Sequence, residues 1–585
     1  LLRYLNPETA PRLAECPVPQ IGFNYLGRIS GTDVPEQLRG DGWGPAPWST
    51  ELAPAPDPDL PALSALEVGA VAVDAPGGTR LEAAFMFPTG LLSRERTMEL
   101  AALWVEALRG MTEHAARPGT GGLTPSDAPL VRVGQPEIEA WEERYGPLTA
   151  VWPQAPGQSG IQFQAAVADG SFDVYHMQFV LRLSGQVDPA RMRTAGQALL
   201  DRHPNLRSAF LAGADGDPVQ VVPERVVLPW RHLDLTGRDE AARDTALETV
   251  LAEDRADQLD PARPPLFRLA LLSYGRDRAA LVLTAHHTVF DGWSSPLVFK
   301  DLIQLYSGAQ EPAPVRSYGD YLAWLSTRDR AASAARWKAE LAGFDQPALV
   351  APDAPLREKA SALGRVEVPL SIDKGRELAG RAAELGITLN TLVQGAWGIL
   401  LAKLTGQPDV VFGAAVNGRP ADLPGSDEMV GLFVNSLPIR VFCPPDRSVA
   451  DVVTELQERQ TALLDHHFYG LADIQRDVGM PALFDTMIAF ENYPVDREGI
   501  VEANASAGFT IDGIRPFAGS HYPLSLNASD PYLRLSLDYQ NHLYDRAAAE
   551  AIAARLVRVL EQIRTDPAVP VGAVDVLTAG ERASS

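Results

Sequence analysis

Hydrophobic and polar residues follow strand and helix periods along most of the chain, and the pattern is clearest near its middle. Apolar positions predict two strands, at Leu266 to Ser273 and at Ala279 to Ala285, with a polar turn at Tyr274 to Arg278 between them. A helix is predicted to begin behind Ser294 as its N-cap and to stop at Gly308. The residues between the second strand and the helix therefore form a corner that rigid elements hold on both sides and that opens to a cleft.

The same patterns recur in both halves of the chain. Asp188 is expected to cap a helix that has Pro189 in its first turn and ends at Arg202. Further strands are predicted at Met177 to Leu183, Gly364 to Leu370, Val410 to Val416, Phe433 to Val441 and Leu483 to Glu491, and a segment at Tyr532 to Tyr539 completes the second half. Further helices are predicted at 328 to 341, 373 to 385, 389 to 404, 449 to 465 and 546 to 564. Strands followed by helices predict an α/β fold.

The first part of the chain forms a block of its own. Strands are predicted at Leu66 to Val73 and Arg80 to Phe87, and a helix near Ser93 to His114 carries apolar residues on one face. A stretch rich in Gly, Pro, Thr and Ser follows at Ala115 to Pro129 and is typical of a linker. We therefore expect a partial α/β lobe at the N-terminus, separate from the rest.

Composition and charge narrow the class of protein. The 585 residues are 46% hydrophobic and 22% charged, as in well-packed globular proteins. The formal charge of -24 argues against binding nucleic acid or an anionic membrane, because both need a basic face. Two cysteines cannot make a disulfide framework, and no run of about 18 apolar residues or signal peptide is found, so a cytoplasmic location is expected. The chain begins without Met, which suggests that it is part of a longer protein.

Candidate chemistry gathers in the predicted corner, where His286, His287, Asp291 and Gly292 lie within seven positions. A single histidine in an apolar strand is most often a core residue. A metal site is disfavoured because adjacent strand residues point to opposite faces and no HExxH pattern or cysteine cluster is present. The same alternation lets one imidazole face the cleft while the other packs, which favours an acid–base site.

This segment, HHxxxDG followed by Trp-Ser, resembles the core motif of condensation domains in nonribosomal peptide synthetases. Arg202 to Phe210 resembles that family's RHxxLRxxF segment, Ser317 to Trp324 its YxDYxxW segment, and Val430 to Ser436 its VGxFVNT segment. The resemblance implies two chloramphenicol-acetyltransferase-like lobes in a V-shaped pseudo-dimer, with a tunnel between them. It also implies that the chain joins a donor peptidyl thioester to the amine of an acceptor aminoacyl thioester, both carried on 4'-phosphopantetheine arms of carrier proteins.

The resemblance assigns roles to individual residues. His287 is expected to handle a proton or position the amine, His286 to pack behind it, and Asp291 to be structural and paired with Arg419. Gly292 is grouped with these three as a catalytic residue, because it permits a close backbone turn. Substrate binding or structural support is expected of Trp293, Ser294, Arg207, Arg419 and Asn435. No metal and no directly bound cofactor are expected. His466 and His467, which lack an Asp-Gly companion, are interpreted as favourable partners of a helix dipole.

The N-terminal block carries a resemblance of its own. Pro19 to Arg28 contains the FNYLG segment found near the end of epimerization domains. The expected domains are an epimerization fragment at 1–118, a linker at 119–145, condensation lobes at 146–312 and 313–575, and the start of a connector to an adenylation domain at 576–585. An epimerase ahead of the condensation domain implies a D-configured donor. The expected partners are the upstream donor and downstream acceptor carriers and the neighbouring epimerization and adenylation domains.

Three alternatives share the motif or the fold. An epimerase would also carry HHxxxDG, although residues from 130 onward contain no second FNYLG segment. An acyltransferase that uses coenzyme A is another enzyme of related fold. A docking domain without catalytic activity is the third alternative, and such relatives have degraded motifs.

Overall fold

The computed structural model describes residues 6–15, 19–29, 62, 64–75, 78–117, 120–167, 174–308, 313–352, 363–491, 507–517, 519–529 and 533–577. Contacts divide the chain into two units, Leu1–Gly121 and Gly122–Ser585. The division falls between residues 121 and 122, where the sequence predicted a domain boundary between 118 and 119.

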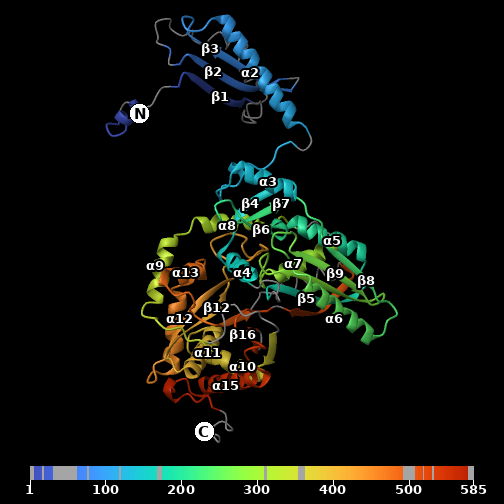
Figure 1. Ribbon diagram of the computed structural model, residues 1–585, viewed down its shortest axis with the longest axis vertical. Helices are drawn as coiled ribbons and strands as arrows, with labels where there is room; N and C mark the ends of the chain where they lie inside the picture. Colours follow the sequence, from blue (N-terminus) through green and yellow to red (C-terminus); the bar gives the residue numbers. More distant parts are fainter. Residues whose placement is uncertain are drawn as a thin grey trace, which may run out of the picture. The chain divides into compact units, whose positions relative to one another are not determined.

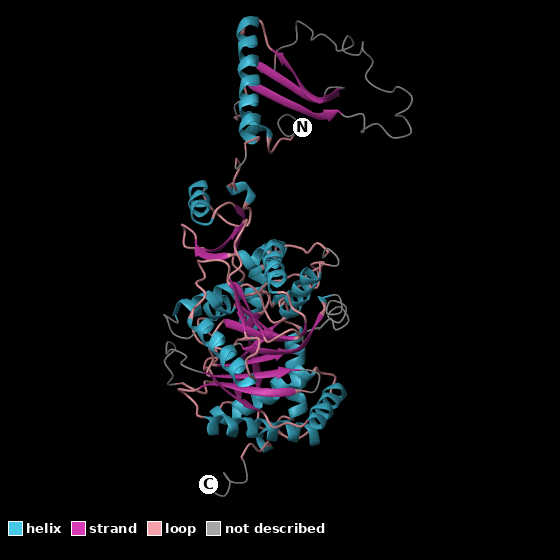
Figure 2. Cartoon of the chain, turned by 90° about the vertical axis from the view of Figure 1, so that its right-hand side faces the viewer, coloured by secondary structure: helices cyan, strands magenta, loops and turns pink. Residues whose placement is uncertain are grey.

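The first unit is a three-stranded sheet beside one long helix (Figure 2). Its strands lie in the order β1 (Ile21–Ile29), β2 (Leu66–Ala75) and β3 (Gly78–Met86), with β1 and β2 parallel and β2 and β3 antiparallel. The short helix α1 (Ala10–Ala14) precedes them, and α2 (Arg94–Ala115) follows. The Ser93 hydroxyl caps α2 by accepting a hydrogen bond from the N–H of Arg96. The rings of Phe85 and Trp104 meet edge to face at 5.9 Å and join the helix to the sheet.

The second unit contains the two predicted lobes, and the sheet of its first lobe has the order β15-β5-β10-β9-β8. The strands are β5 (His176–Gly185), β8 (Trp230–Asp234), β9 (Phe267–Ser273), β10 (Arg278–His286) and β15 (Phe509–Phe517). Helices α5 (Pro189–Arg202) and α7 (Ser295–Ser307) pack on one face. Helix α6 (Glu240–Ala256) packs on the other (Figure 1). Apolar residues on both faces explain why β10 is a nearly continuous apolar run.

Strand β15 corrects the predicted division between the lobes. It belongs to the range 313–575 that was assigned to the second lobe, yet it pairs antiparallel with β5 of the first. Without it, β5 would be an edge strand with a row of unpaired N–H and C=O groups. Helix α4 (Pro156–Val167) belongs to the range assigned to the first lobe, yet it contacts β13 and α13 of the second lobe. The lobes therefore exchange segments and are not two consecutive blocks.

The second lobe is built on a six-stranded sheet with the order β11-β17-β16-β14-β12-β13. The strands are β11 (Leu363–Glu367), β12 (Asp409–Val416), β13 (Asn435–Phe442), β14 (Thr486–Glu491), β16 (Leu524–Ser529) and β17 (Arg534–Gln540). The helices packed on its larger core are α10 (Ile372–Glu384), α11 (Leu389–Thr405), α12 (Val449–Thr461) and α15 (Arg546–Thr565) (Figure 1). A smaller core includes residues of α9 (Arg330–Glu340) and α13 (Leu471–Val478).

A third, smaller sheet carries the entry segment of this unit. Its order is β4 (Leu148–Pro153), β7 (Pro218–Pro223) and β6 (Ala209–Ala212), and α3 (Gln135–Tyr145) packs against it. Helix α8 (Tyr318–Ser326) contacts β4. Short 3₁₀ turns lie at Pro125–Asp127, Pro204–Arg207, Leu464–His466 and Val571–Ala573.

Some boundaries differ from the predicted ones. The predicted helix from 449 to 465 ends at Thr461, and a separate 3₁₀ turn follows at Leu464–His466. Strand β14 begins at Thr486 instead of Leu483, because Leu483 and Phe484 pack in the smaller core and Asp485 accepts hydrogen bonds from the N–H groups of Val350 and Ala351. Of the connector predicted at 576–585, residues 578–585 lie outside the described residues.

Helix α11 is buried over eleven consecutive positions from Thr391 to Leu401. In the part of the chain that the structure describes, no single helix meets the length and hydropathy expected of a membrane span. Helices α10 and α11 meet that criterion only together, across a bend of 101°.

Candidate active site

The predicted corner exists and separates its two histidines. Strand β10 ends at His286, and the N–H of His287 donates to the carbonyl of Tyr175 at 2.8 Å. His286 is fully buried, and its Nδ1 accepts hydrogen bonds from the Thr288 hydroxyl at 2.5 Å and the Thr288 N–H at 3.2 Å. His287 instead lines a large cavity. The alternation of side chains along a strand thus sends one imidazole into the protein and the other into the cavity.

This cavity, which we call the reaction cavity, has a volume of about 2180 Å³ and is lined by both lobes. The first lobe contributes Tyr175, His287 and Gly292 to its wall, and the second contributes Asn435 and Ser436. Polar side chains from β11, β16 and β17 line another part of it, among them Arg365, Ser525, Asn527, Ser536, Asp538 and Gln540. The cavity lies where the sequence predicted a tunnel, and His287 faces it.

Burial determines the protonation state of His287. Loss of hydration is the largest effect and lowers the pKa of the imidazole below its ordinary value, while the charge of Asp291 acts to raise it. Burial prevails, so the neutral imidazole is the dominant form near pH 7. A neutral imidazole can accept a proton, which is what a general base requires.

Asp291 is fully buried and connects the two lobes. One carboxylate oxygen, Oδ2, accepts hydrogen bonds from the N–H groups of Phe433 at 2.9 Å and Val434 at 3.2 Å. The other, Oδ1, accepts from the N–H of Ser294 at 2.9 Å. The N–H of Asp291 itself donates to the carbonyl of Gly431 at 3.1 Å. The carboxylate therefore holds the loop at 287–294 of the first lobe against the segment 431–434 of the second.

Arg419 completes this connection. Its Nη2 lies 3.7 Å from Asp291 Oδ1 and donates to the Ser294 hydroxyl at 2.8 Å. Its Nη1 donates to the carbonyl of Met429 at 2.8 Å and to that of Ser426, and the guanidinium lies over the Phe433 ring, 4.1 Å from the centroid. Burial lowers the pKa of Arg419, and Asp291 acts in the opposite direction. The predicted pairing of these two residues is observed.

Ser294 differs from its predicted role as a helix cap. It occupies the N-cap position of α7, but its side chain accepts no hydrogen bond from the helix backbone. Its hydroxyl instead lies 2.9 Å from Asp291 Oδ1 and 2.8 Å from the carbonyl of Gly431. The Ser294 oxygen that would accept a capping hydrogen bond therefore belongs to the hydrogen-bond network between the lobes.

The remaining predicted residues fall into two groups. Gly292 and Asn435 line the reaction cavity. The Asn435 amide donates to the carbonyls of His467 at 2.8 Å and Tyr469 at 2.9 Å, so it also holds the turn after α12. Trp293 is half-buried and does not belong to the described cavity lining.

Arg207 lies away from the reaction cavity. Its buried guanidinium donates to the carbonyls of Leu200, Asp201 and Pro223 at 3.0, 2.9 and 3.2 Å. It therefore joins the end of α5 to β7 and gives structural support.

The interpretation of His466 and His467 as helix-dipole partners is wrong. Helix α12 ends at Thr461, and His466 lies in the following 3₁₀ turn with its Nδ1 2.9 Å from the Ser333 hydroxyl. Burial lowers the pKa of His467 to about 4, so this imidazole is neutral and carries no charge for a dipole to stabilise.

The sequence did not point to several polar residues of the cavity wall, among them Tyr175 and His521. Tyr175 precedes β5, and His521 follows β15, and the Tyr175 hydroxyl lies 2.7 Å from His521 Nδ1. They are 346 positions apart in the sequence, and neither belongs to a recognisable catalytic motif. No local signal could have joined them.

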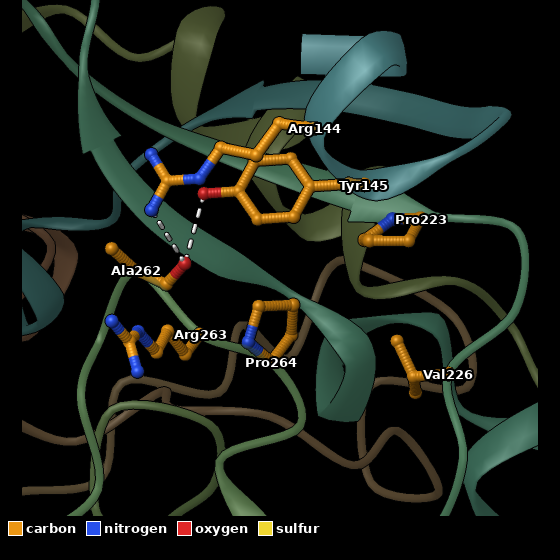
Figure 3. A pocket seen from close by; sticks show the side chains of 7 residues that line it. All are labelled: Arg144, Tyr145, Pro223, Val226, Ala262, Arg263 and Pro264. Atoms are coloured by element: carbon orange, nitrogen blue, oxygen red, sulfur yellow. Dashed lines mark hydrogen bonds between the residues drawn. The ribbon is translucent and has the colours of Figure 1, made fainter.

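A second cavity, of about 440 Å³, has neither His286 nor His287 in its lining. Figure 3 shows the side chains that line it. It is lined by Arg144, Tyr145, Pro223, Val226, Ala262, Arg263 and Pro264. The Tyr145 hydroxyl donates to the Ala262 carbonyl at 2.9 Å, and Arg144 approaches the same oxygen at 3.5 Å. The Arg144 and Tyr145 side chains therefore make a local contact with the backbone. Within the described ranges, no group of three His, Cys, Asp or Glu side chains is placed to hold a metal ion.

Comparison with known proteins places the chain in a family. The family model described as "Condensation domain" matches residues 150–584. A linear gramicidin synthase of Brevibacillus parabrevis is 31% identical over 99% of this chain, and chondramide synthase of Chondromyces crocatus is 30% identical over 90% of it. The chain belongs to the condensation-domain family of nonribosomal peptide synthetases. It spans 11% and 14% of the length of those two relatives.

Solved structures share the fold. The first condensation domain of the calcium-dependent antibiotic synthetase, in complex with a substrate analogue, superimposes with a TM-score of 0.61 at 22% identity. It matches 74% of this chain and 100% of its own. A mutant of the starter condensation domain of rhizomide synthetase gives 0.62 at 21% identity, over 73% of this chain and 98% of its own. The predicted α/β fold with two chloramphenicol-acetyltransferase-like lobes is confirmed.

Proposed function

We propose that this chain forms a peptide bond between two thioester substrates. The observation that carries the proposal is the position of His287, a neutral imidazole on the wall of a cavity that both lobes line. The family to which the chain belongs supports the same reaction. A cavity of about 2180 Å³ has room for two substrates.

The chemistry needs one base and two aligned substrates. The acceptor amine attacks the donor thioester carbonyl, so that a C–N bond forms and the C–S bond breaks. The amine loses a proton, which His287 accepts, and the thiolate leaving group takes up one proton, so the overall reaction conserves protons. Alignment of two tethered reactants contributes independently of the base, since it converts an encounter between molecules into a reaction within one complex.

Both substrates are proposed to arrive on 4'-phosphopantetheine arms of carrier proteins. A tethered substrate must reach His287 through the cavity, and an extended arm suits an opening between two lobes. An upstream donor carrier, a downstream acceptor carrier, and epimerization and adenylation domains of the same synthetase are the proposed partners. The proposed location is the cytoplasm, where the precursors of such substrates are made.

The donor is proposed to have the D configuration at its reacting residue. The support is the first unit, whose β1 carries the FNYLG segment typical of the end of an epimerization domain. The linear gramicidin synthase aligns with 99% of the chain and so includes a counterpart of this unit directly before a condensation domain. Inverting an α-carbon exchanges a hydrogen for a side chain, and a misfit of about 3 kcal/mol gives roughly a hundredfold preference.

The test uses carrier proteins loaded chemically with defined aminoacyl-phosphopantetheine groups. Donors carry D- or L-alanine and D- or L-phenylalanine with a blocked amine, and acceptors carry glycine or L-alanine. Amide product is measured by mass spectrometry after release from the carrier. Faster condensation of the D-donors is expected. Equal or faster use of the L-donors contradicts the stereochemical proposal, and no amide from any pair contradicts the reaction and favours a docking role.

A further inference from the structure

His287 and Tyr175 are opposite each other at the end of a strand pair. Strands β10 and β5 pair antiparallel, with His286 opposite His176, and the His287 N–H continues the ladder by donating to the Tyr175 carbonyl at 2.8 Å. Directly opposite residues of an antiparallel pair place their side chains on the same face, with Cβ atoms about 5 Å apart. Both residues line the reaction cavity. Tyr175 is therefore the cross-strand neighbour of His287 on the cavity face.

His521 reaches Tyr175 from another part of the chain. It lies between β15 and β16, and its Nδ1 is 2.7 Å from the Tyr175 hydroxyl. The His521 carbonyl accepts a hydrogen bond from the Gln540 amide at 2.6 Å, and its ring lies 4.0 Å from that of Tyr522 between centroids. The first contact holds the backbone of His521, while Tyr522 and the Tyr175 hydroxyl contact the imidazole itself. His521 lines the reaction cavity as well.

The protonation of the pair follows from its surroundings. Burial lowers the pKa of His521 to about 4, so the imidazole is neutral at working pH. A neutral imidazole and a phenol carry one N–H and one O–H hydrogen. If the phenol donates to Nδ1, the second hydrogen is on Nε2, and if Nδ1 donates to the phenol oxygen, the second hydrogen is on that oxygen. In either tautomer the hydrogen bond between the two residues uses one hydrogen, and the other lies outside this bond.

We propose that Tyr175 and His521 act together as one hydrogen-bond donor to the thioester carbonyl of the donor substrate, beside His287 in the reaction cavity. The inference rests on the proposed function and adds a second polar element to it. Negative charge develops on the carbonyl oxygen when the amine attacks, and a neutral donor held in a buried site stabilises that charge without having to reorganise. His287 receives the proton of the amine, and the pair stabilises the oxyanion.

Three variants test the pair. Tyr175→Phe removes the hydroxyl and keeps the ring, and His521→Leu removes both ring nitrogens. In His521→Asn the amide can donate to the phenol oxygen, so that the phenol hydrogen stays available for the substrate. The matched control is Tyr544→Phe, which loses a comparable hydrogen bond, to the carbonyl of Val350 at 3.1 Å, outside the described cavity lining.

Condensation of the preferred loaded carriers is measured as kcat and KM, together with the melting temperature of each variant. Tyr175→Phe and His521→Leu are each expected to lower kcat about 10- to 100-fold with little change in KM, because the contact strengthens in the transition state. The double variant Tyr175→Phe/His521→Leu is expected to lose no more than either single variant, since the two residues act as a unit. His521→Asn is expected to recover most of the rate that His521→Leu loses.

The outcomes separate this inference from the proposed function. An unsubstituted protein that forms no amide contradicts the proposed function. An active parent whose Tyr175→Phe variant stays within about twofold of Tyr544→Phe contradicts the pair alone, because a transition-state contact is worth more than that. Losses of kcat that follow a fall in melting temperature, or that multiply in the double variant, also overturn the inference, because they describe two independent structural contacts.

Discussion

The carboxylate of Asp291 accepts a hydrogen bond from the backbone N–H of Phe433 at 2.9 Å and so joins residues 142 positions apart. Asp291 follows the two histidines in the first lobe, and Phe433 precedes β13 in the second. The distance of His287 from the opposite wall of the reaction cavity therefore depends on this contact. Asp291 stabilises the position of the loop that carries His287.

Removing this carboxylate is expected to destabilise the protein. In Asp291→Ala, the N–H groups of Phe433 and Val434 lose their acceptor and Arg419 stays buried without its counter-ion. Loss of one partner of a buried ion pair costs about 3–5 kcal/mol, which unfolding in urea measures. Asp320→Ala is the control, because the Asp320 side chain is 51% exposed and its contact to Arg316 is 4.0 Å. A variant of parental stability that has lost only its rate would assign Asp291 to the chemistry.

Replacing the cavity histidine is expected to affect the rate and leave the fold intact. His287→Ala removes the proposed base, and general acid–base groups contribute about 10²- to 10⁴-fold. The amide-forming rate should fall by that factor, while binding of the loaded carriers, measured by fluorescence anisotropy, stays at the parental value. His232→Ala is the matched control, because His232 is an exposed residue of β8. A His287→Ala variant with the parental rate would exclude this residue from proton transfer.

The pH dependence of the rate should show the lowered pKa of His287. The neutral imidazole is the reactive form, so activity is present above the pKa and lost as the pH falls through it. Because burial lowers this pKa from 6.5, the acid limb that belongs to His287 should have its midpoint below 6.5. Rates at saturating carriers are recorded across the pH range for the parent and for His287→Ala. The loss of rate at low pH that remains in the variant comes from protonation of the acceptor amine. A midpoint above 6.5 would mean that charge, and not burial, controls the pKa of the imidazole.

A close approach at Gly431 gives a test of the contact between the lobes. A Cβ atom at this position would lie 2.2 Å from the buried ring of Tyr318, whose hydroxyl donates to the Leu432 carbonyl at 2.5 Å. Gly431→Ala is therefore expected to lower stability by about 1–3 kcal/mol, as overpacking does, and to lower the condensation rate with it. Gly380→Ala is the control, since that helical glycine has open space around its Cβ and alanine favours the helix by about 1 kcal/mol. A neutral Gly431→Ala would show that Tyr318 can move away.

Local chemistry made several elements predictable from the sequence. The N-cap Asp188 with Pro189 after it sets the start of α5, the left-handed Gly308 sets the end of α7, and both lie where the sequence predicted them. The corner between β10 and α7 was also predicted, because its two histidines and Asp-Gly pair are adjacent in the chain. Each of these features depends on residues within a few positions of each other, which periodicity and capping preferences describe.

The tertiary structure decided which distant segments meet. Strand β15 adds to the first lobe because β5 has an open edge, which nothing in residues 509–517 could signal. The Ser294 hydroxyl joins Asp291 and Gly431 instead of capping α7, and Tyr175 meets His521 across 346 positions. A hydrogen bond forms only between groups that packing brings within about 3 Å of each other. The sequence therefore determines which donors and acceptors are present, and the tertiary structure determines which of them pair.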